Sequence, residues 1–287
     1  MKVMVLGFTG FLGSHMTRML LNNNHEIVGI KRKTSSLEKV QDIGNRIKTY
    51  DVEEIDRLFE ENKIEVVINC ATKYDRKNSN IQELIQSNTL FPLSVLERAI
   101  NNKVECFINT DTFLNKNNFK QNYLLGYSLS KKQFLEWAKL LTKNTKTKFI
   151  NMRLEHLYGI NDKFDKFIPY VINQMKTNVK SIDLTEGNQK RDFIYVDDVC
   201  DAYKCIINNI EKIQDFKEIE VGTGKSIALK DMVLLVKKKL NSVTKLNFGK
   251  IPYREDEIMD SYAQNSYLKE LGWKPRYDLN KGISKLL

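Results

Sequence analysis

The chain has 287 residues, which suits one or two domains with a large buried core. Apolar residues make up 41% and charged residues 29%, an ordinary balance for a globular protein. The longest apolar runs, such as "VLLV", are far below the roughly 20 residues of a membrane span, and the start of the chain is too short for a signal-peptide core. We therefore expect a cytoplasmic protein with no membrane partner.

The net charge of +10 comes from lysines that are interleaved with acidic residues along the whole chain. No basic stripe or aromatic-basic module stands out, so we expect no nucleic-acid partner, although a diffuse positive field helps to gather polyanionic small molecules such as nucleotides. The four cysteines form no CxxC pair and the three histidines have no metal-ligand spacing, so we expect no metal site.

Short runs rich in Val and Ile alternate with helical patterns through the first half of the chain. Strands are predicted at residues 2–6, 26–30, 46–50, 65–69, 106–110 and 148–153. Helices are predicted at Phe11–Asn23, Glu53–Asn62, Ile81–Asn101 and 127–141. Near-continuous apolar strands alternating with helices predict an α/β fold with a doubly wound parallel sheet, a Rossmann fold.

The second half is less regular and predicts a smaller α/β domain. Helices are expected at Lys166–Lys176, Asp197–Asn209 and Ala228–Leu240, with short strands at 181–184, 193–196, 219–222 and 245–249. We predict a dinucleotide-binding domain over 1–155, which takes back about 194–225, and a substrate-binding domain over 156–287. A cleft between such domains is the usual place for a ligand.

The stretch "GFTGFLG" follows the first predicted strand and opens the first predicted helix. Gly7 permits the tight turn, Gly10 lets the backbone approach a pyrophosphate, and Gly13 lets the helix pack closely on the strand. The helix N-terminus then presents free N–H groups to the anion. This context predicts a dinucleotide site.

The second strand ends in "KRK", and no carboxylate stands there to hold the adenosine ribose. Lys31 and Arg32, followed by Lys33, suit the 2′-phosphate of NADP and favour NADP(H), with NAD(H) as the alternative. A solvated basic loop is the other interpretation of the same residues.

The stretch "YSLSK" carries the chemistry. Tyr127 and Lys131 are four residues apart and therefore share one helical face. An ammonium near a phenol lowers the pKa of the phenol and tunes it toward proton transfer. Thr110 is expected at the carboxyl end of the fifth strand, where its hydroxyl could bond the same substrate oxygen as Tyr127.

These motifs resemble those of the extended short-chain dehydrogenase/reductase family, in its nucleotide-sugar epimerase, dehydratase and reductase group. The stretches "INCAT", "YDVEE", "SNTLFP", "MRLEHLYG", "NQKRDFIYVDDV", "YREDE" and "LKELGWKP" extend the resemblance over essentially the whole chain. His156 departs from the pattern, because the family has Asn there.

The resemblance implies site residues as well. The implied catalytic residues are Thr110, Tyr127 and Lys131. The implied cofactor contacts are Gly7, Thr9, Gly10, Phe11, Leu12, Gly13, Lys31, Arg32, Asp51, Val52, Cys70, Ala71, Thr72, Asn88, Tyr127, Lys131 and Arg153. The implied substrate contacts are Thr72, Asp111, Thr112, His156, Lys166, Arg191, Arg254 and Glu257.

The family hosts several sugar reactions, so the site must decide among them. Its 4,6-dehydratases carry Thr-Asp-Glu at the end of the fifth strand, whereas this chain has Thr110, Asp111 and Thr112 and lacks the base for dehydration. Further matches to a CDP-sugar subgroup imply NADPH-dependent reduction of the C4 ketone of a CDP-linked 4-dehydro-6-deoxy or 3,6-dideoxy sugar, in surface-polysaccharide biosynthesis.

Three alternatives stay open: an NAD-dependent 4-epimerase, a 4,6-dehydratase, and a non-catalytic NADP-binding regulator. Regulators of that kind usually lose the Tyr-x-x-x-Lys pair, which this chain keeps. The family often dimerises through a four-helix contact, so the resemblance also implies a homodimer.

Overall fold

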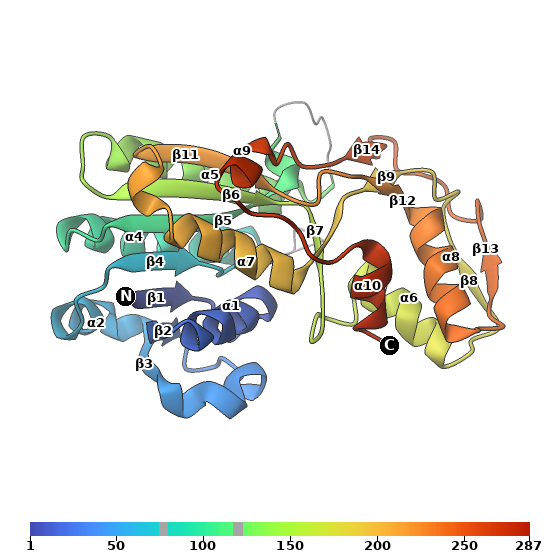
Figure 1. Cartoon of the computed structure of the whole chain (residues 1–287), viewed down its shortest axis with the longest axis horizontal. Coiled ribbons are helices and arrows are strands. Elements are labelled where there is room, and N and C mark those ends of the chain that lie inside the picture. Colours follow the sequence, from blue (N-terminus) through green and yellow to red (C-terminus); the bar gives the residue numbers. More distant parts are fainter. Residues whose placement is uncertain (75–79, 117–122) are drawn as a thin grey trace. The chain divides into compact units, whose positions relative to one another are not determined.

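The computed structural model describes residues 1–74, 80–116 and 123–287. The chain divides into two compact units. Of the described residues, the first unit comprises those within 1–117, 122–153 and 203–219, and the second those within 154–202 and 220–287. The two units are coloured along the sequence in Figure 1. Which ligand each unit binds stays a prediction.

The first unit is built on a seven-stranded parallel sheet with the order β11-β6-β5-β4-β1-β2-β3. The predicted doubly wound parallel fold is therefore confirmed. The strands are β1 (Lys2–Leu6), β2 (Glu26–Lys31), β3 (Ile47–Asp51), β4 (Val66–Asn69), β5 (Cys106–Thr112), β6 (Lys148–Leu154) and β11 (Phe216–Val221). The helices are α1 (Phe11–Asn22), α2 (Ile55–Glu61), α3 (Ile81–Ile85), α4 (Phe91–Asn101), α5 (Leu125–Thr142) and α7 (Val196–Ile207), whose last turns belong to this unit.

Alternate residues of the strands face opposite sides of the sheet. On one side, Met4, Val28 and Phe107 join a buried core with residues of α2, α4 and α5, such as Leu58, Leu96 and Phe134. Helix α1 follows β1 and contacts β1 and β2 (Figure 1). Because the strands are parallel, their carboxyl ends share one edge, where open α/β sheets bind ligands.

One predicted helix differs from its prediction. The pattern over Ile81–Asn101 predicts a single helix, but α3 and α4 are separated by a π-helical segment, Gln86–Leu90. A π-bulge inserts an extra residue into the turn and re-aims the side chains within it. It places Asn88 in the buried interior.

The described part of the second unit contains short strands and helices of its own. The strands are β7 (His156–Tyr158), β8 (Ser181–Asp183), β9 (Lys190–Arg191), β10 (Phe193–Tyr195), β12 (Ile227–Ala228), β13 (Lys245–Asn247) and β14 (Asp260–Ser261). They form the small sheets β10-β7, β12-β9-β14 and β13-β8. The helices are α6 (Phe167–Lys176), α8 (Leu229–Leu240), α9 (Ser266–Glu270) and α10 (Leu279–Ser284). Among the residues that the structure describes, no helix is long and apolar enough to cross a membrane.

Candidate active site

The glycine turn between β1 and α1 has the conformation that its sequence predicts. Gly7 has a φ of +73°, which only glycine adopts without strain. A Cβ atom on Gly13 would lie 2.0 Å from the carbonyl oxygen of Gly7, so only glycine fits there as well. Helix α1 begins after Gly10 with no side-chain cap and no acidic residue in its first turn. Its N-terminus therefore suits an anion.

The basic end of β2 is partly neutralised. Lys31 Nζ donates to Asp51 Oδ1 at 2.7 Å, and the two residues face each other in the register of β2 and β3. Asp51 and Lys31, both predicted to contact the cofactor, therefore hold each other. Arg32 is exposed in the loop that follows.

The three predicted catalytic residues come from β5 and α5 and lie together. Lys131 Nζ donates to the Thr110 carbonyl oxygen at 2.7 Å and lies 5.9 Å from the centre of the Tyr127 ring. The Thr110 hydroxyl shares a hydrogen bond of 2.7 Å with the Tyr203 hydroxyl of α7. Tyr203 follows from no motif in the sequence, because the contact joins residues 93 apart.

The ionisation of this group differs from the sequence expectation. Burial, with the nearby Tyr74 phenol, raises the pKa of Tyr127 well above its usual value, while a hydrogen bond to the Thr72 side chain works in the opposite direction. Burial lowers the pKa of Lys131, and the carboxylate of Asp111 partly opposes that shift. We expected Lys131 to lower the pKa of the Tyr127 phenol, but in the chain alone that pKa is raised, and burial is the largest cause. The Tyr127 phenol is therefore protonated in this state.

Tyr74 is a site residue that sequence reasoning missed. Its ring stacks on Tyr127 with centroids 4.3 Å apart and planes at 21°, and the Tyr127 hydroxyl donates to the Tyr74 hydroxyl at 3.3 Å. Tyr74 follows β4 in the loop that carries Cys70, Ala71 and Thr72. An aromatic residue just after the strand-four motif is a signal that could have found it.

The loop over residues 70–74 (the β4 loop) is held from α5 and the π-helical segment. Asn88 accepts from the Lys73 amide at 2.8 Å and donates to the Lys73 carbonyl at 2.9 Å and to Ser130 Oγ at 3.0 Å. Asn88 was predicted to contact the cofactor, but its side chain is buried and binds the loop backbone. Burial raises the pKa of Cys70 to about 12, so its thiol is not a nucleophile.

Two predicted substrate contacts on β5 have other partners. The Asp111 side chain is 0% exposed, and its oxygens accept from the Thr112 amide and from Asn115 and Asn151. Thr112 Oγ1 accepts from the Leu114 amide at 3.3 Å and thereby caps a 3-10 turn. Both side chains thus have hydrogen-bond partners within the chain, and their contact with a sugar stays a prediction.

Arg153, a predicted cofactor contact, forms an ion pair with Glu218 on β11 and lies 3.8 Å from Asp111. Glu218 carries no sequence signal, because a single acidic residue in a strand is a common surface feature.

The predicted substrate residues of the second unit form an ionic group. Arg191 pairs with Glu257 and also donates to the Ile258 carbonyl, while Arg254 lies 3.7 Å from the second oxygen of Glu257. His156 Nδ1 is 3.8 Å from the buried Glu155 carboxylate. Burial lowers the pKa of His156, and the nearby Arg191 acts in the same direction. Lys166 stands at the N-cap of α6.

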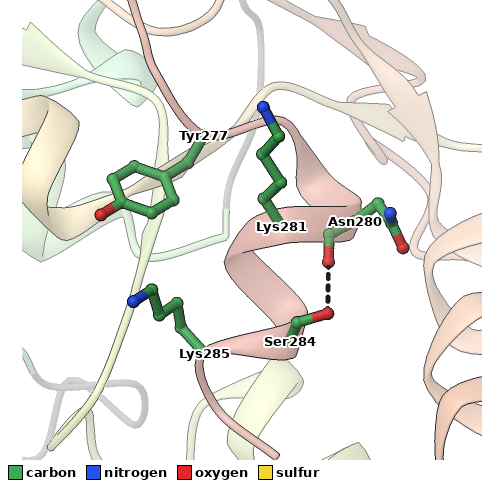
Figure 2. A pocket seen from close by; sticks show the side chains of 5 residues that line it. All are labelled: Tyr277, Asn280, Lys281, Ser284 and Lys285. Carbon is green, nitrogen blue, oxygen red and sulfur yellow. Dashed lines mark hydrogen bonds between the residues drawn. The ribbon is translucent and has the colours of Figure 1, made fainter.

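A shallow depression lies beside α10 and contains none of the predicted site residues. Tyr277, Asn280, Lys281, Ser284 and Lys285 line it. Figure 2 shows Ser284 donating to the Asn280 carbonyl, a bond within the helix itself. None of Thr110, Tyr127 and Lys131 lines this depression.

The fold and these motifs define a family. The profile of the NAD dependent epimerase/dehydratase family matches residues 3–222. The chain therefore belongs to this family, which confirms the resemblance to the extended short-chain dehydrogenases/reductases.

Individual relatives match the chain over its whole length. The CDP-abequose synthase of Salmonella muenchen is 37% identical over 288 residues, covering 100% of this chain and 97% of the relative. The CDP-abequose synthase of Salmonella typhimurium is 35% identical over 99% of this chain and 97% of the relative. The UDP-glucose 4-epimerase structure from Thermotoga maritima, solved with UDP-glucose, has a TM-score of 0.85 at 21% identity and covers 99% of this chain and 97% of that chain.

Proposed function

We propose that this protein reduces the C4 ketone of a nucleotide-linked 4-dehydro-6-deoxy or 3,6-dideoxy sugar, with NADPH as reductant and CDP as the nucleotide. The observation that carries the proposal is the group at the end of β5, where Lys131 bonds the Thr110 carbonyl beside a protonated Tyr127. The identity to two CDP-abequose synthases supports this choice of reaction and of nucleotide.

The proposed chemistry needs an acid that is protonated before the reaction begins. NADPH, when bound, supplies the hydride that adds to C4 of the sugar. Tyr127 gives its proton to the oxygen on C4 as the general acid. The Thr110 hydroxyl donates a hydrogen bond to the same oxygen, and Lys131 keeps Tyr127 and the cofactor ribose in place.

We propose that the glycine turn binds the pyrophosphate of the dinucleotide. The N-terminus of α1, which has no side-chain cap and no acidic residue in its first turn, supports this assignment. We propose that Arg32 is the ligand of the NADP 2′-phosphate, since Asp51 already engages Lys31. A guanidinium recognises a phosphate through several parallel hydrogen bonds.

We propose that Arg191 and Arg254 bind the diphosphate of the nucleotide sugar and that Glu257 binds the nucleotide ribose. The two arginines lie beside the same carboxylate, so two guanidinium groups are available in one region, and a guanidinium can bind a phosphate through several hydrogen bonds. His156 and Lys166 are proposed as further substrate contacts.

A sugar 4-epimerase is the second candidate, since solved epimerase structures share the fold. Purified protein assayed with CDP-, dTDP- and GDP-linked 4-keto sugars separates the two reactions. NADPH oxidation, followed by its absorbance, with a CDP-linked ketone supports the reductase. Protein that carries bound NAD and interconverts C4 epimers without consuming NADPH contradicts it.

We also propose that the protein is a homodimer that pairs through α5. Leu129, Trp137 and Leu140 of this helix are each at least half exposed. Clustered apolar side chains on a surface indicate an interaction site.

A further inference from the structure

We infer that Asp111 is a positioning residue, which anchors a chain of buried amide side chains that holds the β4 loop against the glycine turn. The inference deepens the proposed function and rests on it only in assigning the glycine turn to the cofactor.

Three asparagines cross the sheet beside Asp111. Asn69 ends β4, Asn109 lies on β5 and Asn151 lies on β6. Asn69 Nδ2 donates to Asn109 Oδ1 at 2.9 Å, and Asn109 Nδ2 donates to Asn151 Oδ1 at 2.8 Å. Asn151 Nδ2 then donates to Asp111 Oδ2 at 2.9 Å. All four side chains are buried, and we call them the amide ladder.

The ladder runs in one direction because it ends on a carboxylate. A carboxylate only accepts hydrogen bonds, so Asn151 must turn its NH₂ group toward Asp111 and its oxygen toward Asn109. The same orientation is then imposed on Asn69. Asp111 Oδ1 accepts from the Thr112 amide and from Asn115 Nδ2, each at 2.8 Å. Hydrogen bonds aligned in this way strengthen one another in a buried setting.

The far end of the ladder fixes the β4 loop. The Ala71 amide donates to Asn69 Oδ1 at 3.1 Å. Ala71 packs directly on the glycine turn, because a Cβ atom on Gly7 would lie 2.8 Å from its Cα. Asn88 holds the same loop two residues later, at Lys73. The ladder therefore sets the point of the loop nearest the glycine turn.

The position of Asp111 in the sequence suggests two other roles, a dehydratase-type acid and a sugar contact, and its burial argues against both. Its side chain has no exposed surface, and both oxygens already accept hydrogen bonds from the chain. A dehydratase-type acid or a sugar contact needs an accessible oxygen. The residue acts on the site through the ladder and through its charge, which opposes the desolvation of Lys131.

The test transfers the carboxylate from β5 to the neighbouring strand β6. Asp111→Asn places an NH₂ group against a donor. If that donor is Asn151 Nδ2, the ladder is broken; if it is the Thr112 amide, the ladder loses its anchor on β5. The double variant Asp111→Asn/Asn151→Asp restores every bond, because the carboxylate introduced on β6 accepts both from Asn109 and from the amide introduced on β5. A catalytic or substrate-binding carboxylate would not be rescued by this exchange.

Two measurements report on the β4 loop and do not require catalytic turnover. Hydrogen exchange of the peptide spanning Ala71 reports the Ala71 amide, and fluorescence titration with NADPH, and in parallel NADH, reports cofactor affinity. Asp111→Asn is expected to speed the exchange and to raise the dissociation constant, each by about tenfold. The double variant is expected to return both to within about threefold of wild type.

A second variant interrupts the ladder at Asn109 and tests whether Asp111 acts on the β4 loop through the ladder. Asn109→Ser leaves the carboxylate intact and is expected to reproduce both effects of Asp111→Asn. Asp198→Asn is the matched control, because Asp198 is equally buried and accepts two backbone amides, those of Arg276 and Tyr277, outside the ladder. It is expected to lower Tm and to leave exchange at Ala71 unchanged.

The inference is overturned if the double variant Asp111→Asn/Asn151→Asp fails to restore the protection of the Ala71 amide from hydrogen exchange. It is also overturned if the Ala71 amide and the cofactor affinity of Asn109→Ser are the same as in wild type. Should Asp111→Asn fail to fold, the double variant and Asn109→Ser decide by the same criteria. Wild-type protein that binds neither NADPH nor NADH contradicts the proposed function, while the exchange measurement still decides the role of the ladder.

Discussion

Close contacts restrict the side chains that the candidate site can accept at single positions. Tyr127 is enclosed by the ring of Tyr74 and by Lys131. Gly13 lies so close to Gly7 that a side chain cannot enter. These contacts therefore predict how substitutions at Tyr127 and Gly13 change activity and stability.

Tyr127→Phe is expected to keep NADPH affinity and to lower kcat by about 10²- to 10⁴-fold, because it removes only the acid. Steady-state kinetics with a CDP-linked 4-keto sugar, together with a cofactor titration, measures both quantities. Tyr267→Phe, on α9, is the control and should retain full activity. Turnover that survives in Tyr127→Phe would exclude the phenol as the proton donor.

Gly13→Ala is expected to lower the free energy of unfolding by about 1–3 kcal/mol, because its Cβ overlaps the Gly7 carbonyl. Gly44→Ala is the matched control. A Cβ atom on Gly44 meets no atom within 4 Å, and the change should alter stability by less than about 1 kcal/mol. Urea denaturation compares the two, and equal effects would show that the close approach at Gly13 is not the cause.

At the scale of elements, strand ends carry most of the candidate site. The carboxyl ends of β1, β2, β4 and β5 carry the glycine turn, the basic loop, the β4 loop and Thr110. In the second unit, β7 and β9 carry His156 and Arg191. We therefore expect charged residues at these ends to affect cofactor specificity and the dependence of stability on pH.

Arg32→Ala is expected to raise KM for NADPH by about tenfold or more and to leave KM for NADH unchanged, because only NADPH has the 2′-phosphate. Kinetics with both cofactors give the ratio. Lys63→Ala, another exposed cation of the same unit, should change neither constant. An equal loss with NADH would mean that Arg32 does not read the 2′-phosphate.

The lowered pKa of His156 predicts a loss of stability in acid. The unfolded chain takes up a proton near the usual value of 6.5, while folded His156 resists protonation, so stability falls as the pH drops below 6.5. His156→Asn removes this contribution. Its unfolding free energy should therefore fall less than that of wild type between about pH 7.5 and about pH 5.5. Parallel curves for the two proteins would contradict the assignment.

At the scale of the whole molecule, exposed apolar side chains suggest where two copies of the chain pair. Leu140 of α5 is 61% exposed, and Val243 after α8 is 82% exposed. Only Leu140 belongs to the apolar stripe of α5 that we propose as the dimer contact.

Leu140→Glu is expected to convert the dimer into a monomer, because it places a charge in an apolar contact. Val243→Glu is the matched control and should leave the oligomeric state unchanged. Light scattering coupled to gel filtration measures the mass of each. A wild-type monomer, or a dimer unaffected by Leu140→Glu, would show that α5 is not the interface.

Local patterns predicted the individual strands and the glycine turn, because both depend on neighbours in sequence. The helix over Ile81–Asn101 was less well predicted, since no propensity marks the π-helical segment at Asn88. The partners of Asp111 and Thr110 were missed because they come from strands and helices about 40 and 93 residues away. A signal for the amide ladder was present: the pair Ile-Asn recurs at 68–69, 108–109 and 150–151, within three strands of the sheet.

The path of the chain has a practical consequence for dissecting the protein. The first unit is interrupted after residue 153 and resumes at residue 203, where Tyr203 and strand β11 complete it. No single continuous fragment can reproduce either unit, so truncation at the apparent midpoint would remove a sheet strand and the hydroxyl that meets Thr110. Swapping substrate specificity between relatives therefore calls for grafting separate segments into an intact chain.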